Sequence, residues 1–208
     1  MSQVLDELVS LLSMEPIEED LFRGASQDLG FRQMFGGQVL GQSLSAASQT
    51  VGDGRLVHSL HGYFLRPGDA GLPVVYQVER VRDGGSFSTR RVTAIQKGKT
   101  IFTCAASSQG IEEGFHHQAQ MPEVPGPETL RSETVLARLV ADKLPERLRE
   151  RAVHDKPIDI RPVSLNNPFD PKPADPVKHV WFRADGALPD NPALHQYLLA
   201  YASDFGLL

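Results

Sequence analysis

"GGQVLGQSLSAASQTVG", residues 36–52, decides the fold, because it has a helical pattern and contains no charged residue. Leu40, Leu44, Ala47 and Val51 recur at spacings of four, three and four, which predicts a helix with one apolar face. Surface helices normally carry Lys or Glu on their outer side, whereas this segment is polar only through Gln and Ser. We therefore predict that other parts of the chain wrap around this helix.

The segments that follow have the pattern of antiparallel strands. In residues 55–67, alternation places His58 with Leu60 on the side that should meet the helix, and His61 on the other side. Turn residues at 83–86 and 97–99 separate three further strands, expected within residues 72–82, 86–96 and 100–110. With a first helix ending near Met14 and a short strand within 18–26, these segments predict an α+β domain over residues 1–113.

The second half of the chain predicts a linker and then a repeat of the pattern. Residues 114–155 are polar and contain prolines, with one helix expected over residues 133–150. Its predicted buried stripe is Leu136, Leu139, Val140 and Leu144. Residues 156–208 contain strands near 156–164 and 177–186.

A second helix without charged residues follows Asn191, which is predicted to be its N-cap. Its expected apolar stripe is Leu194, Leu198, Tyr201, Phe205 and Leu208. The first helix is followed by the long strands within residues 55–110 that enclose it, but no strand follows the second helix before Leu208. We therefore expect the second domain to be incomplete in this sequence.

Composition excludes several classes of protein. With 208 residues, 40% of them hydrophobic, the chain can bury a large core, and its net charge of -5 argues against nucleic acid as the main partner. A single cysteine, Cys104, cannot form an internal disulfide, and no Cys/His spacing suggests zinc. The N-terminus mixes acids into its apolar positions, and no 18 apolar residues run together. These features predict a cytoplasmic protein with no membrane span and no metal.

Asp204 is unusual, because it is an acid near the end of an apolar helix. Burying an ionised carboxylate costs several kcal/mol unless it gains donors or a proton, and an acid at a helix C-terminus also opposes the helix dipole. The alternative is an ordinary acid that faces solvent where the helix ends.

Three further residues are candidates for substrate binding. Histidine is the side chain that most often changes its charge near neutral pH, and His58 is expected to face the first helix, although a strand histidine bonded to the backbone is more common. Gly36 and Gly37 allow close approach of the backbone, and the helix N-terminus could donate amides to a carbonyl oxygen or a phosphate. A tight turn into a buried helix explains the pair equally well.

The remaining motifs favour structural explanations. Six basic residues gather on the strands and could meet phosphate, but exposed strands also use such charges to block edge pairing; they are Arg80, Arg82, Arg90, Arg91, Lys97 and Lys99. Gly84 and Gly85 lie between strands and predict a hairpin turn, not a phosphate cradle. No serine lies in a GxSxG motif, so a serine hydrolase has no support.

Four motifs carry a resemblance to a known family: "MFGGQVLGQSLSAA", "VHSLHGYFLRPGD", "GGSFSTRRVTAIQKGKTIF" and "HQYLLAYASDF". In order and spacing they resemble the type II acyl-CoA thioesterases, the TesB-like proteins, from about Leu21 to Leu208. The resemblance implies a tandem, or double, hotdog in which each antiparallel sheet curls around one long helix. It also implies that Asp204 is the catalytic acid, that no metal or cofactor is used, and that Thr or Ser and Gln partners lie beyond Leu208.

The prediction is therefore hydrolysis of acyl-CoA to free fatty acid and CoA, by a water activated through a network anchored on Asp204. The expected partners are the acyl-CoA substrate and further copies of the chain, in fatty acid metabolism. Two alternatives remain. A hotdog enoyl-CoA hydratase would place an Asp and a His close together in one site, and a non-catalytic acyl-CoA binder or assembly subunit would need no base at all.

Overall fold

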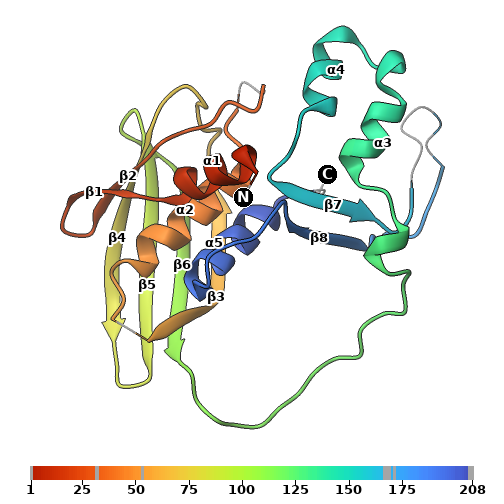
Figure 1. The fold of residues 1–208 in the computed structure, drawn as a ribbon. Helices are drawn as coiled ribbons and strands as arrows, with labels where there is room; N and C mark the ends of the chain where they lie inside the picture. The colour runs from red at the N-terminus through yellow and green to blue at the C-terminus, as the bar shows by residue number, and fades with distance from the viewer. Residues whose placement is uncertain (1, 31–32, 53, 166–169, 171, 206–208) are drawn as a thin grey trace. The chain divides into compact units, whose positions relative to one another are not determined.

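The computed structural model describes residues 2–30, 33–52, 54–165, 170 and 172–205 (Figure 1). The chain forms two compact units. The sheet unit comprises Asp6–Gly114 and Pro189–Leu208, and the small unit comprises Met1–Leu5 and Phe115–Leu188.

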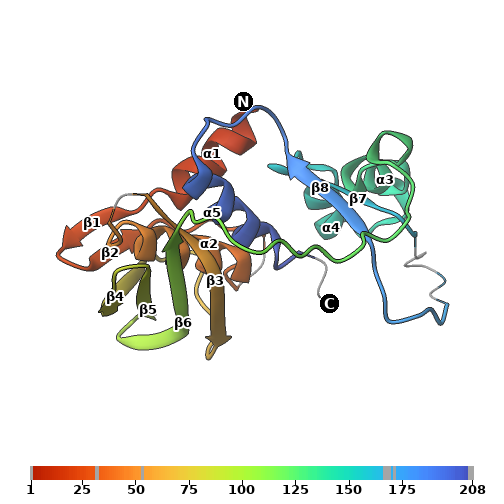
Figure 2. The same cartoon turned by 90° about the horizontal axis from the view of Figure 1, so that it is seen from below.

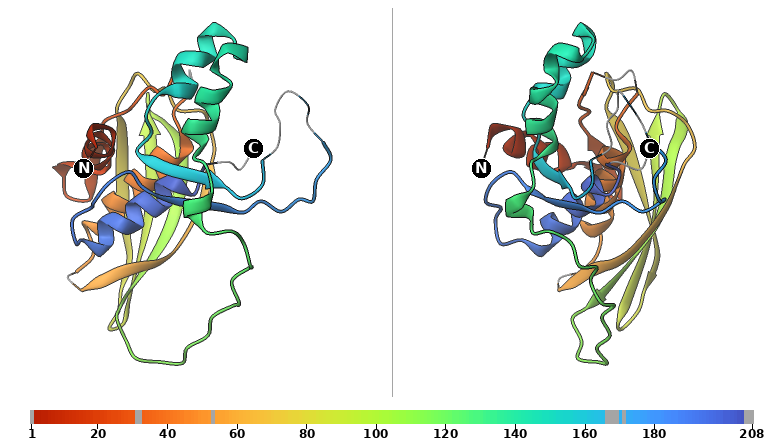
Figure 3. Two further views of the ribbon diagram at one scale, coloured as in Figure 1. Left: turned by 45° about the vertical axis from the view of Figure 1, so that its right-hand side comes forward. Right: turned by 90° about the vertical axis from the view of Figure 1, so that its right-hand side faces the viewer.

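A six-stranded antiparallel sheet dominates the sheet unit, in the order β1-β2-β4-β5-β6-β3. The strands are β1 (Glu15–Glu18), β2 (Leu21–Gly24), β3 (Arg55–Phe64), β4 (Val74–Asp83), β5 (Phe87–Gln96) and β6 (Lys99–Gly110). The strands predicted from alternation are confirmed, and β1 is an addition. Figure 3 shows the long strands curving together as one curled sheet.

The helix α2 (Gly36–Ser48) lies against the inner face of this sheet, as the absence of charge predicted (Figures 1 and 3). Ten of its residues are buried, three of them Gln or Ser between Gln38 and Ser43. Its apolar residues join a core with the inward side chains of the sheet, among them Tyr76, Val92 and Phe102. The predicted architecture, a hotdog, is confirmed for this unit.

Among the irregularities of the sheet are β-bulges in β3 and β4. In β3, the register shifts between Val57 and Ser59, so that His58 is an extra residue. In β4, the register shifts between Arg80 and Arg82, and Val81 is the extra residue. A bulge of this kind changes the face to which the following side chains point.

The helix α5 (Pro192–Ala202) packs beside α2 within the same unit (Figure 2). Asn191 is its N-cap, as predicted, and its side chain accepts hydrogen bonds from the amides of Ala193 and Leu194. The expected stripe is confirmed through Tyr201, but the helix ends at Ala202, so Phe205 lies in the turn beyond it. Leu208, the last expected member of the stripe, lies outside the described residues.

The small unit contains a two-stranded sheet of β7 (Ile158–Pro162) and β8 (Val180–Ala184), both predicted. The single helix expected over residues 133–150 is wrong. The chain forms α3 (Glu133–Leu139) and α4 (Glu146–Val153), separated by a short 3-10 turn, because Pro145 cannot continue a helix and instead precedes α4. The predicted buried stripe is also wrong, since α3 has no buried residue and Leu139 is 62% exposed.

The predicted division of the chain into residues 1–113, 114–155 and 156–208 stays a prediction.

The helix α1 (Gln3–Leu12) is the first element, close to where it was expected. None of the helices in the described ranges is long and apolar enough to cross a membrane.

Candidate active site

Asp204 lies at the amino end of α2, although 167 residues separate it from Gly37 in the sequence. Its Oδ2 accepts a hydrogen bond of 2.9 Å from the Gly37 amide, in the first turn of the helix. The residue that precedes α2, Phe35, provides no side-chain cap. Because the first amides of a helix have no partner within it, the Asp204 carboxylate supplies a cap from a distant part of the chain.

The position of Asp204 differs from the expectation that it lies on a helix. It follows the C-cap residue Ser203, in a turn, and is half-buried. The turn directs the carboxylate to the amino end of α2, where the helix dipole favours a negative charge. The carboxylate therefore avoids the unfavourable dipole of its own helix.

Gly36 and Gly37 are required for this close approach. A Cβ on Gly36 would lie 2.7 Å from Asp204 Oδ2 and 2.9 Å from Cζ of Phe64. A Cβ on Gly37 would overlap the backbone carbonyl oxygen of Tyr201 and the ring of Phe35. The glycine pair thus lets the carboxylate and the end of α5 contact α2, and its role in substrate binding stays a prediction.

Several aromatic rings lie near the amino end of α2. Phe35, Tyr201 and Phe205 form a cluster with ring centroids 4.8 to 5.6 Å apart. Phe64, at the end of β3, packs on Phe102 and is 54% exposed. An apolar surface therefore lies next to the acid and is partly open to solvent.

Burial raises the pKa of Asp204, while hydrogen bonds from the amides of Gly37 and Gly36 act in the opposite direction. A carboxylate held in this way is more basic than one in water, which is the property that a general base requires. No histidine is among the described groups that shift its pKa.

His58 lies on the opposite face from the one expected. Since it is the extra residue of the β3 bulge, it is exposed on the outer face of the sheet, which points away from α2 and carries Thr89, Arg91 and Ser107. There its Nε2 lies 3.0 Å from Ser107 Oγ. His61 also lies on the outer face, opposite Ala105, as predicted. The geometric reason for assigning His58 to the substrate is lost.

Five of the six basic residues noted in the sequence divide into three groups. Arg80, Arg91 and Lys97 form surface ion pairs, which agrees with the structural explanation. Arg90 differs, because it is 1% exposed and binds Asp83 and Thr50 beneath the sheet. Arg82 has no acceptor for its guanidinium among the described residues. Nothing in the strand alternation distinguishes these three environments.

The part of the chain that the structure describes contains no set of metal ligands. There is no group of three or more His, Cys, Asp or Glu side chains close enough to hold an ion. Burial raises the pKa of the Cys104 thiol to about 12, so this cysteine is not a nucleophile at neutral pH.

Comparisons with known proteins identify the family of the chain. The family model described as "Acyl-CoA thioesterase N-terminal domain" matches residues 26–109, and "Acyl-CoA thioesterase" matches residues 147–208. Acyl-CoA thioesterase 2 of Haemophilus influenzae is 46% identical over 99% of this chain and 72% of its own length. The chain belongs to the acyl-CoA thioesterase family. The predicted family and its class of enzyme, the thioester hydrolases, are thus confirmed.

Two further relatives extend the comparison. Acyl-coenzyme A thioesterase 8 of Homo sapiens is 41% identical over 97% of this chain, which spans 66% of the human protein. The crystal structure of the acyl-CoA thioesterase II TesB2 from Mycobacterium marinum is 41% identical, with a TM-score of 0.71. The match between the two covers 96% of this chain and 69% of the solved chain.

The sequence did not identify the aromatic residues of the site. Phe35 directly precedes the glycine pair and Phe64 ends the strand that follows, so their positions were a usable signal. The contact of Phe35 with Tyr201 and Phe205 could not be read from spacing, because it depends on how α5 packs against α2.

Proposed function

We propose that the protein hydrolyses acyl-CoA thioesters, with Asp204 as the general base or as the anchor of the water that attacks the thioester carbonyl. The observation that carries this proposal is a half-buried carboxylate, raised in pKa, held by backbone amides beside an exposed aromatic ring. A thioester has a good leaving group, so a positioned water is sufficient and no covalent intermediate is required.

Asp204 can bind a water and the helix at the same time. A carboxylate has two oxygens with about four acceptor sites, and the amides of Gly36 and Gly37 use only part of this capacity. The same amides fix the orientation of the carboxylate, which limits the directions in which a bound water can point.

Gly36 and Gly37 have a different role in this proposal from direct donation to the substrate. The Gly37 amide is already given to Asp204, so it is not available to a carbonyl oxygen in this arrangement. The glycines instead keep the space in front of α2 free of side chains. The acyl group would then lie against Phe64, whose ring shares that space with Asp204.

The test measures thiol release from acyl-CoA by the protein that carries this sequence at its natural length. Asp204→Asn retains an oxygen that can cap α2 but removes the base, and we expect activity to fall by about 100-fold or more. Asp190→Asn is the matched control, since Asp190 is an exposed acid just before α5. Unchanged turnover in Asp204→Asn would leave the carboxylate as a helix cap only and would reject the mechanism.

A second substrate distinguishes hydrolysis from hydration. Crotonyl-CoA offered to the same protein should lose its thioester and keep its double bond. Hydration of the double bond with the thioester intact would favour the hydratase. Tight binding of acyl-CoA with neither reaction would favour a non-catalytic binder.

We also propose that the protein acts in the cytoplasm, in fatty acid metabolism, as a homo-oligomer. A single cysteine that is buried and unpaired supports a reducing compartment. Light scattering on the purified protein measures the oligomeric state, and a mass equal to one chain would reject the last part of this proposal.

A further inference from the structure

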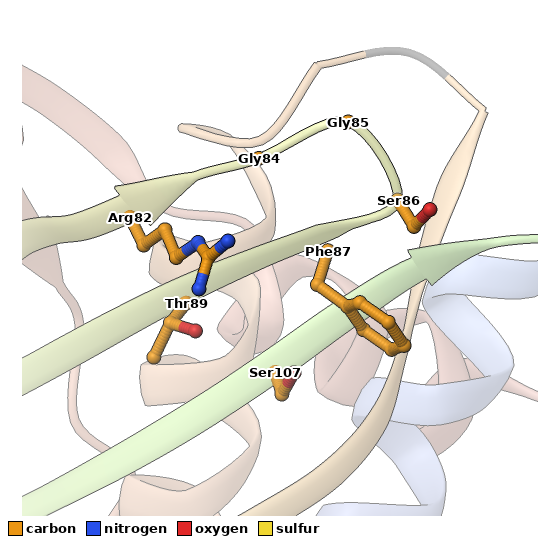
Figure 4. A pocket seen from close by; sticks show the side chains of 7 residues that line it. All are labelled: Arg82, Gly84, Gly85, Ser86, Phe87, Thr89 and Ser107. Atoms are coloured by element: carbon orange, nitrogen blue, oxygen red, sulfur yellow. The ribbon is translucent and has the colours of Figure 1, made fainter.

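The outer face of the sheet carries a hollow that is separate from the acid site. It has a volume of about 540 Å³ and lies at the hairpin between β4 and β5 (Figure 4). Its lining residues are Arg82, Gly84, Gly85, Ser86, Phe87, Thr89 and Ser107. The volume is within the range of about 300–1,000 Å³ that is usual for small-molecule sites.

A row of polar side chains crosses four strands at this level. Arg82 on β4 lies opposite Thr89 on β5, and Thr89 lies opposite Ser107 on β6. His58 on β3 closes the row through its contact with Ser107 Oγ. With neighbouring strands about 4.8 Å apart, the row is about 14 Å long, which is larger than a lone ion requires.

Two of the sheet's bulges lie at this row, one in β3 and one in β4. Without the shift in β4, Val81 would oppose Thr89, and Arg82 would point to the inner face. Without the shift in β3, His58 would oppose Ser108 and would also point inward. Two independent departures from regular pairing thus bring a cation and an imidazole to the same face, and bulges are frequent next to functional sites.

Arg82 is the one arginine of the six strands whose guanidinium has no acceptor among the described residues. The other five bind carboxylates, hydroxyls or backbone carbonyls. None of the seven lining residues carries a carboxylate. The hollow is therefore positively charged, and hydroxyl groups from Ser86, Thr89 and Ser107 add hydrogen-bond donors for an anion.

The hairpin that frames the hollow is held rigidly. Arg55 Nη2 donates to the carbonyl oxygens of Gly84 and Gly85 at 2.7 and 2.6 Å, and the Gly84 amide donates to the Phe87 carbonyl at 2.8 Å. Glycine at 84 also allows Arg82 to lie along the turn, since a Cβ there would be 3.3 Å from Arg82 Nε. A site held in this way loses little entropy when a ligand binds.

Phe87 indicates the second part of the ligand. In Figure 4 its side chain lies on the right of the hollow, with Arg82 on the left; its ring is 44% exposed and contacts His58 edge to face at 5.8 Å. An exposed ring beside an arginine suits a ligand with a planar base and a phosphate, because bases stack on aromatic rings and guanidinium groups bind phosphate oxygens.

We propose that this hollow binds a nucleotide, with its phosphate on Arg82 and its base against Phe87. The same chemistry occurs in a free adenine nucleotide and in the nucleotide end of CoA. The site lies on the face of the sheet opposite to α2, so binding there does not depend on Asp204 and the proposed hydrolysis.

The experiment titrates the protein with ADP, following the backbone amides by NMR and the affinity by calorimetry. We expect saturable binding that shifts the amides of Gly84–Phe87 and Ser107, and weaker binding of adenosine and of inorganic phosphate. Arg82→Gln should weaken ADP binding at least about tenfold, because a charge-assisted contact is lost. Phe87→Ala should weaken it several-fold.

Matched variants control for unspecific effects. Arg91→Gln removes another exposed arginine of the outer face, which is already paired with Glu79, and should leave ADP affinity unchanged. Gly84→Ala should weaken binding more than Gly85→Ala, because a Cβ on Gly85 meets nothing within 4 Å. If Arg82→Gln loses its folded amide spectrum, the Gly84→Ala and Gly85→Ala pair gives the same comparison without changing charge.

The outcomes are distinct. No saturable binding, equal loss in Arg82→Gln and Arg91→Gln, or shifts confined to Gly36 and Gly37 would each overturn the proposal. CoA that moves the same amides and displaces ADP would identify the nucleotide end of CoA as the ligand, and CoA without effect would identify a free nucleotide. Asp204→Asn should bind ADP like the unchanged protein, so failure of hydrolysis and failure of this site are seen separately.

Discussion

The helices α2 and α5 lie side by side and both lack charged residues, yet their ends are stabilised in different ways (Figure 2). The amino end of α5 is capped by its own neighbour in sequence, Asn191. The amino end of α2 is bound by Asp204, 167 residues away from Gly37. The difference shows that α5 can begin on local information, whereas α2 depends on the folded sheet unit.

The carboxyl end of α2 is also stabilised from a distance. Arg90 on β5 donates to Thr50 Oγ1 and to the Thr50 carbonyl, at 2.7 and 2.8 Å, just beyond the last residue of the helix. A helix has partial positive charge at its amino end and partial negative charge at its carboxyl end. The charge-free α2 therefore has an acid at the first end and a guanidinium near the second, both supplied by other elements.

The largest change in stability is expected for Arg90→Gln. The guanidinium makes five hydrogen bonds while nearly fully buried, and its loss removes the donor to both Thr50 oxygens and the charged partner of Asp83. We expect the free energy of unfolding to fall by about 3 kcal/mol, measured by urea denaturation. Asp83 is 53% exposed, which keeps the loss below that of a fully buried pair.

Arg91→Gln is the control for that variant. It removes a neighbouring arginine whose ion pair with Glu79 is 57% exposed on both sides, and it should cost less than about 1 kcal/mol. Equal losses in the two variants would contradict a special role of Arg90 at the end of α2.

Gly37→Ala should have the next largest effect, at the other end of α2. The added methyl group would overlap the Tyr201 carbonyl and the Phe35 ring, so α5 would have to move away from α2. We expect a loss of about 2–3 kcal/mol together with reduced thioesterase activity, because Asp204 moves with α5. Gly52→Ala, where a Cβ meets nothing within 4 Å, should change neither quantity appreciably.

The contrast between the helices also explains what the sequence could predict. The Asn191 cap, the strands of the sheet and the burial of α2 follow from local spacing and composition, and all are confirmed. The predicted face of His58 was wrong. A single extra residue in β3 changes the face to which the side chain points, and the alternation of the sequence does not reveal such a residue. The partners of Asp204 and Arg90 come from distant elements, so no local pattern could have revealed them.

Asn191→Ala should cost less than either change at α2. It removes the side-chain oxygen that accepts from the amides of Ala193 and Leu194, and N-cap losses of this kind are about 1 kcal/mol. Hydrogen exchange should accelerate in the first turn of α5 and remain unchanged in α2. Faster exchange throughout α2 would contradict the local character of this cap, and Asp190→Ala, at an exposed neighbouring position, is the control.

The smallest expected effect is a change in stability with pH that comes from Asp204. Burial raises its pKa above the usual value of 3.8, so between 3.8 and the raised pKa the folded protein binds this proton more tightly than the unfolded chain does. The free energy of unfolding should therefore decrease as pH rises through that window, relative to Asp204→Asn. Asp69 and Asp83, whose pKa values are lowered by Lys97 and Arg90, give the opposite slope. Both proteins share these two acids, so their contribution cancels in the difference between urea unfolding curves. A difference that stays constant from pH 3.8 upward would show that the Gly36 and Gly37 amides fully offset the burial of the carboxylate.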